Sequence, residues 1–363
     1  MAWSASAGSR NGCAAEGRSG MTIVLISDGG LEQYACQQLA LQLRRLGRRC
    51  LTVAPALTGP QPLPPCPADL RIDTPMQLLG QSWLNEASAI GVFLRDPSER
   101  QAWIEGYRAL GQHSQHPPAT LFSGPLLPLV GDALIQDISQ RLSCDLLLLS
   151  GPQQLAQLAA MSFNWPSDLQ PPPALATGFW FPPTPAPNAP AQSPLLVALI
   201  QERIPTHLGA REQLIGQLQR WARQHPDWTI VLQRDHGWCA NQPLLPIATR
   251  RPINLIEAAP GQMLNLLARC TACLSVSSPW SLAAMSWGAK AVMVGDYGIQ
   301  AEQNTVAWFG CGAMHRLRDI PDLEALHALP AVNVHWLEGM GGAITDGAAR
   351  LLAALDRHGA VAP

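Results

Sequence analysis

Short apolar segments alternate with longer amphipathic segments along most of this chain. Short apolar runs are typical of buried strands, whereas apolar positions that recur every three or four residues predict helices. In the first half, the predicted strands are 21–26, 50–53, 90–94, 120–122, 145–149 and 174–177. The predicted helices between them include 31–46, 100–110, 132–142 and 153–161. This alternation predicts an α/β fold with a mainly parallel sheet.

The same alternation begins again near residue 195. The second set of predicted strands is 195–200, 228–233, 253–256, 273–276 and 291–294. The second set of predicted helices is 208–224, 261–268, 280–287, 300–308 and 323–329. Because 363 residues with 47% hydrophobic side chains are enough to bury two cores, we expect two α/β domains.

The boundary between these domains is predicted in residues 181–194, which include six prolines and favour an extended, semi-rigid backbone. We therefore assign 21–180 to the first domain and 195–340 to the second. Residues 341–363 are expected to form a closing helix and a tail. Residues 1–20 are expected to be a disordered tail or an upstream mis-start of translation.

Charge, apolar runs and cysteine spacing argue against several classes of function. The net charge of −2 gives no general reason to expect a nucleic-acid partner. No run of 18 apolar residues predicts a transmembrane helix, and residues 1–20 lack the apolar core of a signal peptide. Nine cysteines, an odd number, fit reduced thiols in the cytoplasm. Cys270 and Cys273 form a C-x-x-C without a second pair, so we interpret them as packing residues and expect no metal site.

A serine pair supplies the strongest candidate chemistry. Ser277 and Ser278 follow the predicted strand 273–276, and Pro279 suits the first turn of the next helix. A helix N-terminus carries unpaired N–H groups, so two hydroxyls there would complete a cradle for a nucleotide phosphate. Serine also commonly caps helices, and that alternative remains open.

The first domain places an acidic residue and two glycines at a comparable position. Asp28, Gly29 and Gly30 follow the strand 21–26, and glycine allows a ligand to approach the backbone closely. Neither G-x-G-x-x-G nor the P-loop motif occurs, which excludes typical dinucleotide-binding and P-loop proteins. Asp28 is a candidate general base, with capping of the following helix as its alternative role.

Two further polar segments follow strands of the second domain, and we expect them at the same edge as the serine pair. Gln201 follows the strand 195–200, and Arg234 and His236 follow the strand 228–233. Arginine can clamp a phosphate with two hydrogen bonds, and histidine can donate a hydrogen bond or a proton. A surface ion pair, for example with Asp235, is the alternative role for Arg234.

The order of residues after the serine pair resembles a known family. The matching residues are Ser277, Ser278, Gly288, Asp296, Tyr297, Gly298, Asn304, Phe309 and Gly310. This pattern resembles GT-B glycosyltransferases that use CMP-sugars, including bacterial sialyltransferases and polysialyltransferases. It is more similar still to sialyltransferase-like proteins of the DUF6716 type.

The resemblance implies two Rossmann-like domains facing a cleft, the GT-B fold, and an inverting transfer from a CMP-sugar to a glycan acceptor in polysaccharide biosynthesis. It implies that Ser277, Ser278 and Arg234 hold the donor phosphate. The transfer would need a base from the first domain, for which Asp28 is the candidate, and His236 is the second candidate for a catalytic role. The expected cleft residues are Gly29, Gly30, Gln201, Asp296, Tyr297 and Gly298. We expect no cofactor beyond the nucleotide-sugar substrate.

Two departures from the family pattern keep other functions open. Gln233 replaces a lysine, and Ala283 and Ala284 stand where the wider group has a carboxylate for the donor ribose. Alanine cannot accept a hydrogen bond from a hydroxyl. A UDP-sugar transferase or epimerase, and a degenerate non-catalytic member, are the alternatives. Peripheral association with a membrane is also left open, for a lipid-linked acceptor.

Overall fold

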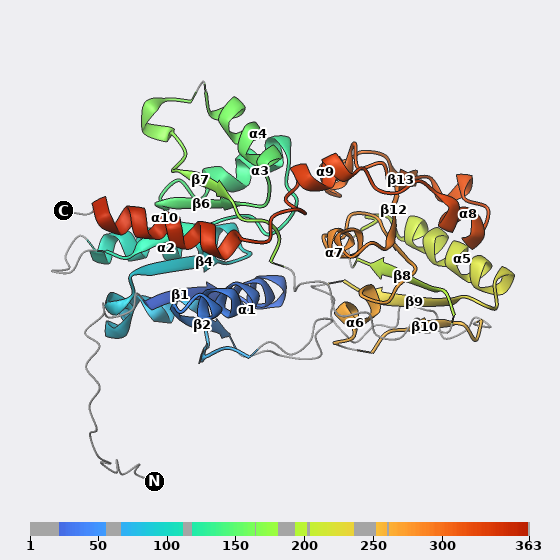
Figure 1. The fold of residues 1–363 in the computed structure, drawn as a ribbon, viewed down its shortest axis with the longest axis horizontal. Helices are drawn as coiled ribbons and strands as arrows, with labels where there is room; N and C mark the ends of the chain where they lie inside the picture. The colour runs from blue at the N-terminus through green and yellow to red at the C-terminus, as the bar shows by residue number, and fades with distance from the viewer. Residues whose placement is uncertain are drawn as a thin grey trace, which may run out of the picture.

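The structure, a computed structural model, describes residues 22–55, 67–111, 118–163, 165–180, 193–201, 204–235, 252–259 and 261–361. They form two lobes that lie side by side, each built on one parallel sheet with helices packed on it (Figure 1). The prediction of two Rossmann-like α/β domains is confirmed. The predicted tail 1–20 lies outside the described residues, as does most of the predicted linker, 181–192.

The first lobe contains a seven-stranded sheet in the order β3-β2-β1-β4-β5-β6-β7. Its strands are β1 (Thr22–Ser27), β2 (Arg49–Pro55), β3 (Leu70–Ile72), β4 (Ala89–Phe93), β5 (Thr120–Ser123), β6 (Leu146–Leu149) and β7 (Ala174–Ala176). The chain runs outward from β1 to β3 and then returns to β4 beside β1. Such a switch point leaves a crevice at the carboxyl ends of the two strands, where α/β proteins bind ligands.

Helices cover both faces of this first sheet. They are α1 (Gly30–Arg45), α2 (Pro97–Gly111), α3 (Gly131–Ser139) and α4 (Pro152–Ser162), with short 3₁₀ turns η1 (Pro75–Gly80), η2 (Ser82–Glu86) and η3 (Ser167–Leu169). Alternate residues of β1 point to opposite faces of the sheet. Ile23 and Leu25 accordingly pack with α1, and Val24 and Ile26 pack with the α2 side.

The second lobe contains a six-stranded sheet in the order β10-β9-β8-β11-β12-β13. Its strands are β8 (Leu195–Ile200), β9 (Thr229–Arg234), β10 (Leu255–Glu257), β11 (Ala272–Ser275), β12 (Lys290–Val294) and β13 (Met314–His315). Its helices and turns are α5 (Leu208–Gln224), α6 (Met263–Leu267), α7 (Trp280–Ser286), η4 (Gly295–Tyr297), η5 (Thr305–Trp308), η6 (Leu317–Asp319), α8 (Leu323–Ala328) and α9 (Val334–Gly339). The switch point of this sheet lies between β8 and β11, just before the serine pair.

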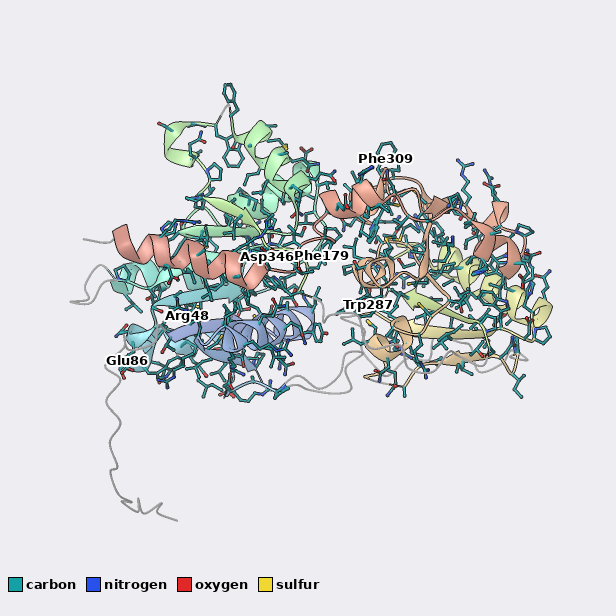
Figure 2. All side chains as sticks on the ribbon, viewed as in Figure 1. Arg48, Glu86, Phe179, Trp287, Phe309 and Asp346 are labelled. Atoms are coloured by element: carbon teal, nitrogen blue, oxygen red, sulfur yellow. The ribbon has the colours of Figure 1, made fainter. Side chains whose placement is uncertain are left out.

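The last helix, α10 (Gly347–Val361), returns to the first lobe (Figure 1). It packs on α1, β5 and β7, where Leu351 and Leu355 are buried in the first-lobe core. Arg48, labelled in Figure 2, forms an ion pair of 3.0 Å with Asp356 of this helix. The end of the chain therefore completes the lobe in which the chain begins.

Apolar side chains join the lobes next to the serine pair. The ring of Tyr34 on α1 meets the ring of Trp280 on α7 edge to face, with centroids 5.5 Å apart. Leu31, also on α1, belongs to the same apolar cluster as Val197 of β8. A second contact involves Phe179, which packs against an apolar cluster of the second lobe and lies near the boundary between the lobes in Figure 2.

Some local predictions differ from the structure. Residues 300–308 were expected to be helical, but only Thr305–Trp308 forms a 3₁₀ turn, η5. Strands β3 and β13 and helix α9 carry only two to six residues each, too few to show a periodic pattern.

Candidate active site

Asp28 lies at the carboxyl end of β1, beside the switch point of the first sheet. Its Oδ2 accepts a hydrogen bond of 2.7 Å from the backbone N–H of Arg95, which follows β4 closely. Helix α1 begins after Gly29 without a side-chain cap, so Asp28 does not take the capping role considered above. It instead ties the ends of β1 and β4 together.

The surroundings of Asp28 favour its protonated form. Burial raises the pKa of this carboxyl to about 6, the nearby Glu32 carboxylate adds to the increase, and the hydrogen bond from Arg95 opposes it. Its Oδ1 is buried and has no hydrogen-bond partner among the described residues. A carboxylate whose pKa lies near 6 can take a proton from a hydroxyl at neutral pH, as a general base must.

Both Gly29 and Gly30 have backbone conformations that favour glycine, and Gly30 is also closely packed. Their φ values are 110° and 56°, in the region that favours glycine. A Cβ added to Gly30 would lie 2.6 Å from Nη2 of Arg95, a side chain that also pairs with Glu32 at 2.9 Å. The close approach that these glycines permit is thus made, in this structure, by the Arg95 guanidinium.

Gln201 and Ser277 meet at the carboxyl ends of β8 and β11. Oε1 of Gln201 accepts a hydrogen bond of 3.0 Å from the backbone N–H of Ser277, and Nε2 donates one of 3.3 Å to Ser277 Oγ. Ser277 is only 2% exposed. The structure therefore brings together the predicted cleft residue Gln201 and the predicted phosphate-binding residue Ser277, and a side-chain oxygen occupies the position that Ser277 N–H points to.

Ser278 belongs to a buried cluster of hydroxyls at the start of α7. Its Oγ accepts a hydrogen bond of 3.3 Å from the N–H of Trp280, and its own N–H donates to Ser275 Oγ at 3.2 Å. Ser275 Oγ in turn lies 2.8 Å from Ser281 Oγ. Ser278 thus satisfies the backbone N–H of Trp280, the first residue of α7, while Pro279 occupies the N-cap position without a side-chain cap.

Arg234 forms an ion pair with Glu257 rather than with Asp235, at 3.4 Å between Nη2 and Oε2. The pair links the carboxyl ends of β9 and β10. Gln233, which replaces the family's lysine, is buried and donates a hydrogen bond to the carbonyl of Arg234. His236, the other predicted residue of this segment, lies outside the described residues.

The segment Asp296, Tyr297 and Gly298 follows β12 and connects it to other parts of the second lobe. Asp296 Oδ2 accepts a hydrogen bond of 2.6 Å from Leu317 N–H, and Tyr297 donates its hydroxyl to the carbonyl of Ala210 on α5 at 3.1 Å. Burial and the adjacent Asp296 raise the pKa of Tyr297 to about 12, so its hydroxyl stays protonated. Gly298 has a φ of 78° that favours glycine.

Ala283 and Ala284, at the positions where the wider group has a ribose-binding carboxylate, are fully buried. They belong to the apolar cluster that contains Leu31 and Tyr34 of the first lobe. A carboxylate at either position would be desolvated among apolar groups, which is costly without a partner. The departure from the family pattern is therefore built into the packing between the lobes.

A group of charged residues near the first switch point was missed by the sequence analysis. Arg100 and Arg141 are buried beside Asp137, on the side of the first lobe where Arg95 follows β4. The one sequence signal was the charged run 95–100 directly after a predicted strand. Helix periodicity had assigned Arg100 and Arg141 to helices, and such arginines are more often exposed.

Cysteines and acidic groups of the described residues offer no clear metal chemistry. No three His, Cys, Asp or Glu side chains gather there as metal ligands. Burial raises the pKa of Cys270 to about 12 and raises that of Cys273 well above its usual value, which disfavours both thiolates. Within the same described ranges, no helix has the length and apolar character needed to cross a bilayer.

Comparison with known proteins places this site in a family. The model of the family described as "Putative glycosyltransferase (DUF6716)" matches residues 107–341. No curated protein matches the sequence. The family model covers β5 through α9, which includes the serine pair and the whole described part of the second sheet.

Solved structures with the same fold span nearly the whole chain. A UDP-N-acetylglucosamine 2-epimerase matches with a TM-score of 0.60 and 11% identity over 95% of this chain and 98% of its own. The UDP-GlcNAc 2-epimerase from Neisseria meningitidis bound to UDP-GlcNAc matches with a TM-score of 0.57 and 14% identity, over 93% and 100%. The calicheamicin glycosyltransferase CalG4 matches with a TM-score of 0.52 and 14% identity, over 95% and 100%. At these identities, the likeness shows a shared GT-B-like fold.

Proposed function

We propose that this chain, which belongs to the DUF6716 family of glycosyltransferases, transfers a sialic-acid-like sugar from a CMP-sugar to a hydroxyl of a glycan acceptor. The donor binds to the second lobe and the acceptor to the first. The reaction inverts the configuration at the anomeric carbon, uses no metal ion or cofactor, and serves polysaccharide biosynthesis in the cytoplasm. Because fold alone does not fix function, the proposal depends on the chemistry of the site.

The hydrogen bond between Gln201 and Ser277 carries the proposal. Oε1 of Gln201 shows that an oxygen acceptor fits 3.0 Å from Ser277 N–H, at the switch point of the second sheet. A phosphate oxygen of the donor can replace Oε1 there, and Ser277 Oγ lies beside it to donate a second hydrogen bond. Since Ser277 is 2% exposed, the Gln201 side chain moves away when the donor binds.

Further groups support a phosphate at this position. Arg234 ends β9, the strand that pairs with β8 on its other side, and its guanidinium is held by Glu257. A neighbouring guanidinium offsets the charge of the phosphate as the donor bond breaks. His236 lies two residues after Arg234 in the sequence. We assign it to the departing phosphate, to which it donates a hydrogen bond or a proton.

The first lobe supplies the base. Asp28 comes just before α1, whose residues Leu31 and Tyr34 pack against the second lobe close to Trp280. Its raised pKa suits a group that accepts a proton from an acceptor hydroxyl, as does its buried Oδ1, which has no hydrogen-bond partner in the part of the chain that the structure describes. Asp28 is thus assigned to the acceptor hydroxyl, and Ser277 to the departing phosphate.

The proposed step is a direct displacement. The acceptor oxygen forms a bond to the anomeric carbon while the bond from that carbon to the CMP phosphate oxygen breaks. Asp28 takes the proton of the acceptor hydroxyl, and CMP leaves with the electron pair of the broken bond. The Ser277 N–H, Ser277 Oγ and Arg234 stabilise the charge that develops on the phosphate.

A binding panel tests this function. Isothermal titration of the whole chain with CMP-N-acetylneuraminate, UDP-N-acetylglucosamine and a GDP-sugar is expected to show selective binding of the CMP-sugar. Selective binding of the UDP-sugar would contradict the CMP proposal and favour a UDP-sugar transferase or epimerase. Binding of none of the three would favour a degenerate, non-catalytic protein.

A further inference from the structure

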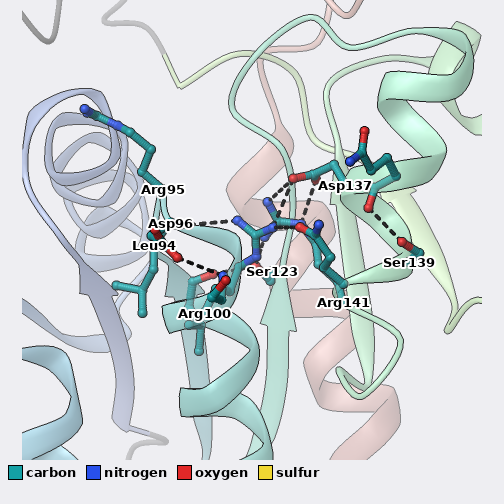
Figure 3. A network of polar contacts seen from close by, with 12 residues as sticks. Leu94, Arg95, Asp96, Arg100, Ser123, Asp137, Ser139 and Arg141 are labelled. Atoms are coloured by element: carbon teal, nitrogen blue, oxygen red, sulfur yellow. Dashed lines mark hydrogen bonds and ion pairs between the residues drawn. The ribbon is translucent and has the colours of Figure 1, made fainter.

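Two buried arginines share one aspartate near the first switch point. Arg100 of α2 is 2% exposed and Arg141, just after α3, is 4% exposed. Figure 3 shows both guanidinium groups converging on Asp137 of α3. Arginine is almost never fully buried unless its charge is compensated, so the balance of charge here needs an explanation.

Asp137 is used mainly by Arg141. Nε of Arg141 donates to Asp137 Oδ2 at 2.8 Å, and Nη2 donates to Oδ1 at 3.0 Å, a bidentate pair. Nη1 of Arg141 also contacts the hydroxyl of Ser123, at the end of β5. One carboxylate therefore compensates Arg141 almost completely.

Arg100 receives weaker compensation. Its Nη2 reaches Asp137 Oδ1 only at 3.2 Å and otherwise donates to the neutral Gln140 Oε1 at 2.8 Å. Its Nη1 donates to the carbonyl of Leu94 at 2.8 Å. Its Nε is buried and has no hydrogen-bond partner among the described residues. Two guanidinium charges thus face a single carboxylate, which leaves one positive charge in excess.

The nearby positive charge of Arg141 affects the pKa of Arg100. Burial and the nearby Arg141 charge lower the pKa of Arg100 to about 10, while Asp137 and, more weakly, Asp28 act in the opposite direction. Arg100 still carries its charge at neutral pH. A buried charge that is only partly compensated is costly, and a second anion beside the two guanidinium groups would reduce that cost.

Both arginines line an open pocket of the first lobe. Its wall also includes Arg95 and Glu32, which pair with each other, and the backbone turn at Gly124. Arg95 is the residue whose N–H binds Asp28, so the pocket adjoins the proposed base. The pocket is open to solvent, and Arg100, Arg141 and Asp137 lie side by side in its wall.

We propose that Arg100 and Arg141 bind an anionic group, a carboxylate or a phosphate, carried by the acceptor sugar. The planar guanidinium forks match the oxygens of either group. This inference rests on the proposed function, because it takes the first lobe as the acceptor side. It adds that the acceptor is acidic, and that its charge holds the reacting hydroxyl near Asp28.

Binding of single sugars to the whole chain tests the inference. Titration with glucuronate, glucose 6-phosphate and glucose, without nucleotide, is expected to show binding of one or both acidic sugars and none of glucose. The two acidic sugars separate carboxylate from phosphate recognition. Equal binding of glucose and the acidic sugars, or no binding of any of them, would overturn the inference.

Three variants locate the site. Arg100→Lys and Arg141→Lys keep the charge but lose the fork, and each is expected to weaken binding of the acidic sugar at least tenfold. Arg108→Lys is the matched control, because Arg108 pairs with Asp145 on the surface of the same lobe, and it should bind as the wild type does. Unchanged affinity in both pocket variants would mean that the network is purely structural. If one variant does not fold, the affinity of the other variant and the comparison of glucose with the acidic sugars in the wild type still test the inference.

A parallel titration with CMP-N-acetylneuraminate separates this inference from the proposed function. Binding of the CMP-sugar without binding of acidic sugars would overturn the acidic-acceptor inference alone. Binding of acidic sugars without any nucleotide sugar would overturn the proposed function, and with it the assignment of the arginine pair to an acceptor.

Discussion

Gln201 binds Ser277 through both ends of its amide, accepting from the backbone N–H at 3.0 Å and donating to the hydroxyl at 3.3 Å. This contact joins the strands on either side of the switch point of the second sheet. In the absence of a ligand, the amide supplies the oxygen that a donor phosphate would supply. The Gln201 amide oxygen and the donor phosphate are therefore expected to compete for the N–H group of Ser277.

Gln201→Ala tests that competition. The substitution removes the internal acceptor of Ser277 N–H and leaves the hydroxyl of Ser277 in place. We expect CMP to bind at least as tightly as to the wild type, because a competing group is gone, while the unliganded protein loses about 1 kcal/mol of stability from two lost hydrogen bonds. Calorimetric affinity and thermal melting measure the two effects. A clear loss of CMP affinity would make Gln201 a direct ligand instead.

Ser278→Ala should act on stability. Its hydroxyl satisfies the buried N–H of Trp280, so we expect the free energy of unfolding to fall by about 1 to 2 kcal/mol. Ser286→Ala, at the exposed end of the same helix, is the matched control and should change stability by less than about 0.5 kcal/mol. Urea denaturation measures both. Equal effects of the two substitutions would contradict the assigned role of Ser278.

The raised pKa of Asp28 makes stability depend on pH. Because its pKa is about 6 in the folded protein and 3.8 in the unfolded chain, the protonated carboxyl stabilises the fold below pH 4, and this stabilisation is lost as the pH rises through 6. Asp28→Asn keeps an acceptor for Arg95 N–H and removes the charge. We expect the variant to gain about 1 kcal/mol over the wild type between pH 4 and pH 8, after allowing for screening by solvent. Denaturation at both pH values measures the difference, and an equal difference at both would contradict it.

The same group should set the pH dependence of transfer. A base works when deprotonated, so kcat/KM is expected to rise with pH and level off above an apparent pKa of about 6. Asp28→Asn should lower kcat by about 10² to 10⁴ and abolish the rise. Activity of the variant within a few-fold of the wild type, with the same profile, would remove Asp28 from the chemistry.

Close packing between the lobes can be probed at Gly151, the residue before α4. A Cβ there would lie 2.2 Å from the carbonyl oxygen of Gly339 at the end of α9, so Gly151→Ala is expected to cost about 1 to 3 kcal/mol. Gly216→Ala, in the middle of α5 with no atoms within 4 Å of the new Cβ, should instead stabilise by about 0.5 to 1 kcal/mol. Thermal melting of both variants measures the contrast. If both substitutions destabilised the protein equally, the loss of stability would come from replacing glycine as such and not from the contact with α9.

The sequence predicted the fold because the signals that decide it are local. Strands such as Leu195–Ile200 and helices such as Leu208–Gln224 have the predicted bounds, since the strand is a continuous apolar run and the helix is amphipathic along its length. The prediction of a helix at 300–308 was wrong because Thr305 Oγ1 hydrogen-bonds to the backbone of Gln300 and Gly298 and holds a compact loop there. Periodicity does not report such contacts.

The candidate site was predictable only in part. Asp28, Gln201 and the serines could be found because each directly follows a strand, and strand ends share one edge of a parallel sheet. The partners of Asp28 and Arg234 could not be predicted, because Arg95 and Glu257 come from distant segments. The buried pair Arg100 and Arg141 shows the same limit, since its charge balance exists only after α2 and α3 pack together.

The most direct test of the central claim compares CMP with cytidine, which differs from it by the phosphate alone. For the wild type, we expect CMP to bind at least tenfold more tightly than cytidine in calorimetric titrations, a difference of about 1.4 kcal/mol. Ser277→Ala should lose most of this difference by weakening CMP and leaving cytidine unchanged, while Ser286→Ala should retain it. Equal affinity of the wild type for CMP and cytidine, or an undiminished difference in Ser277→Ala, would contradict the account.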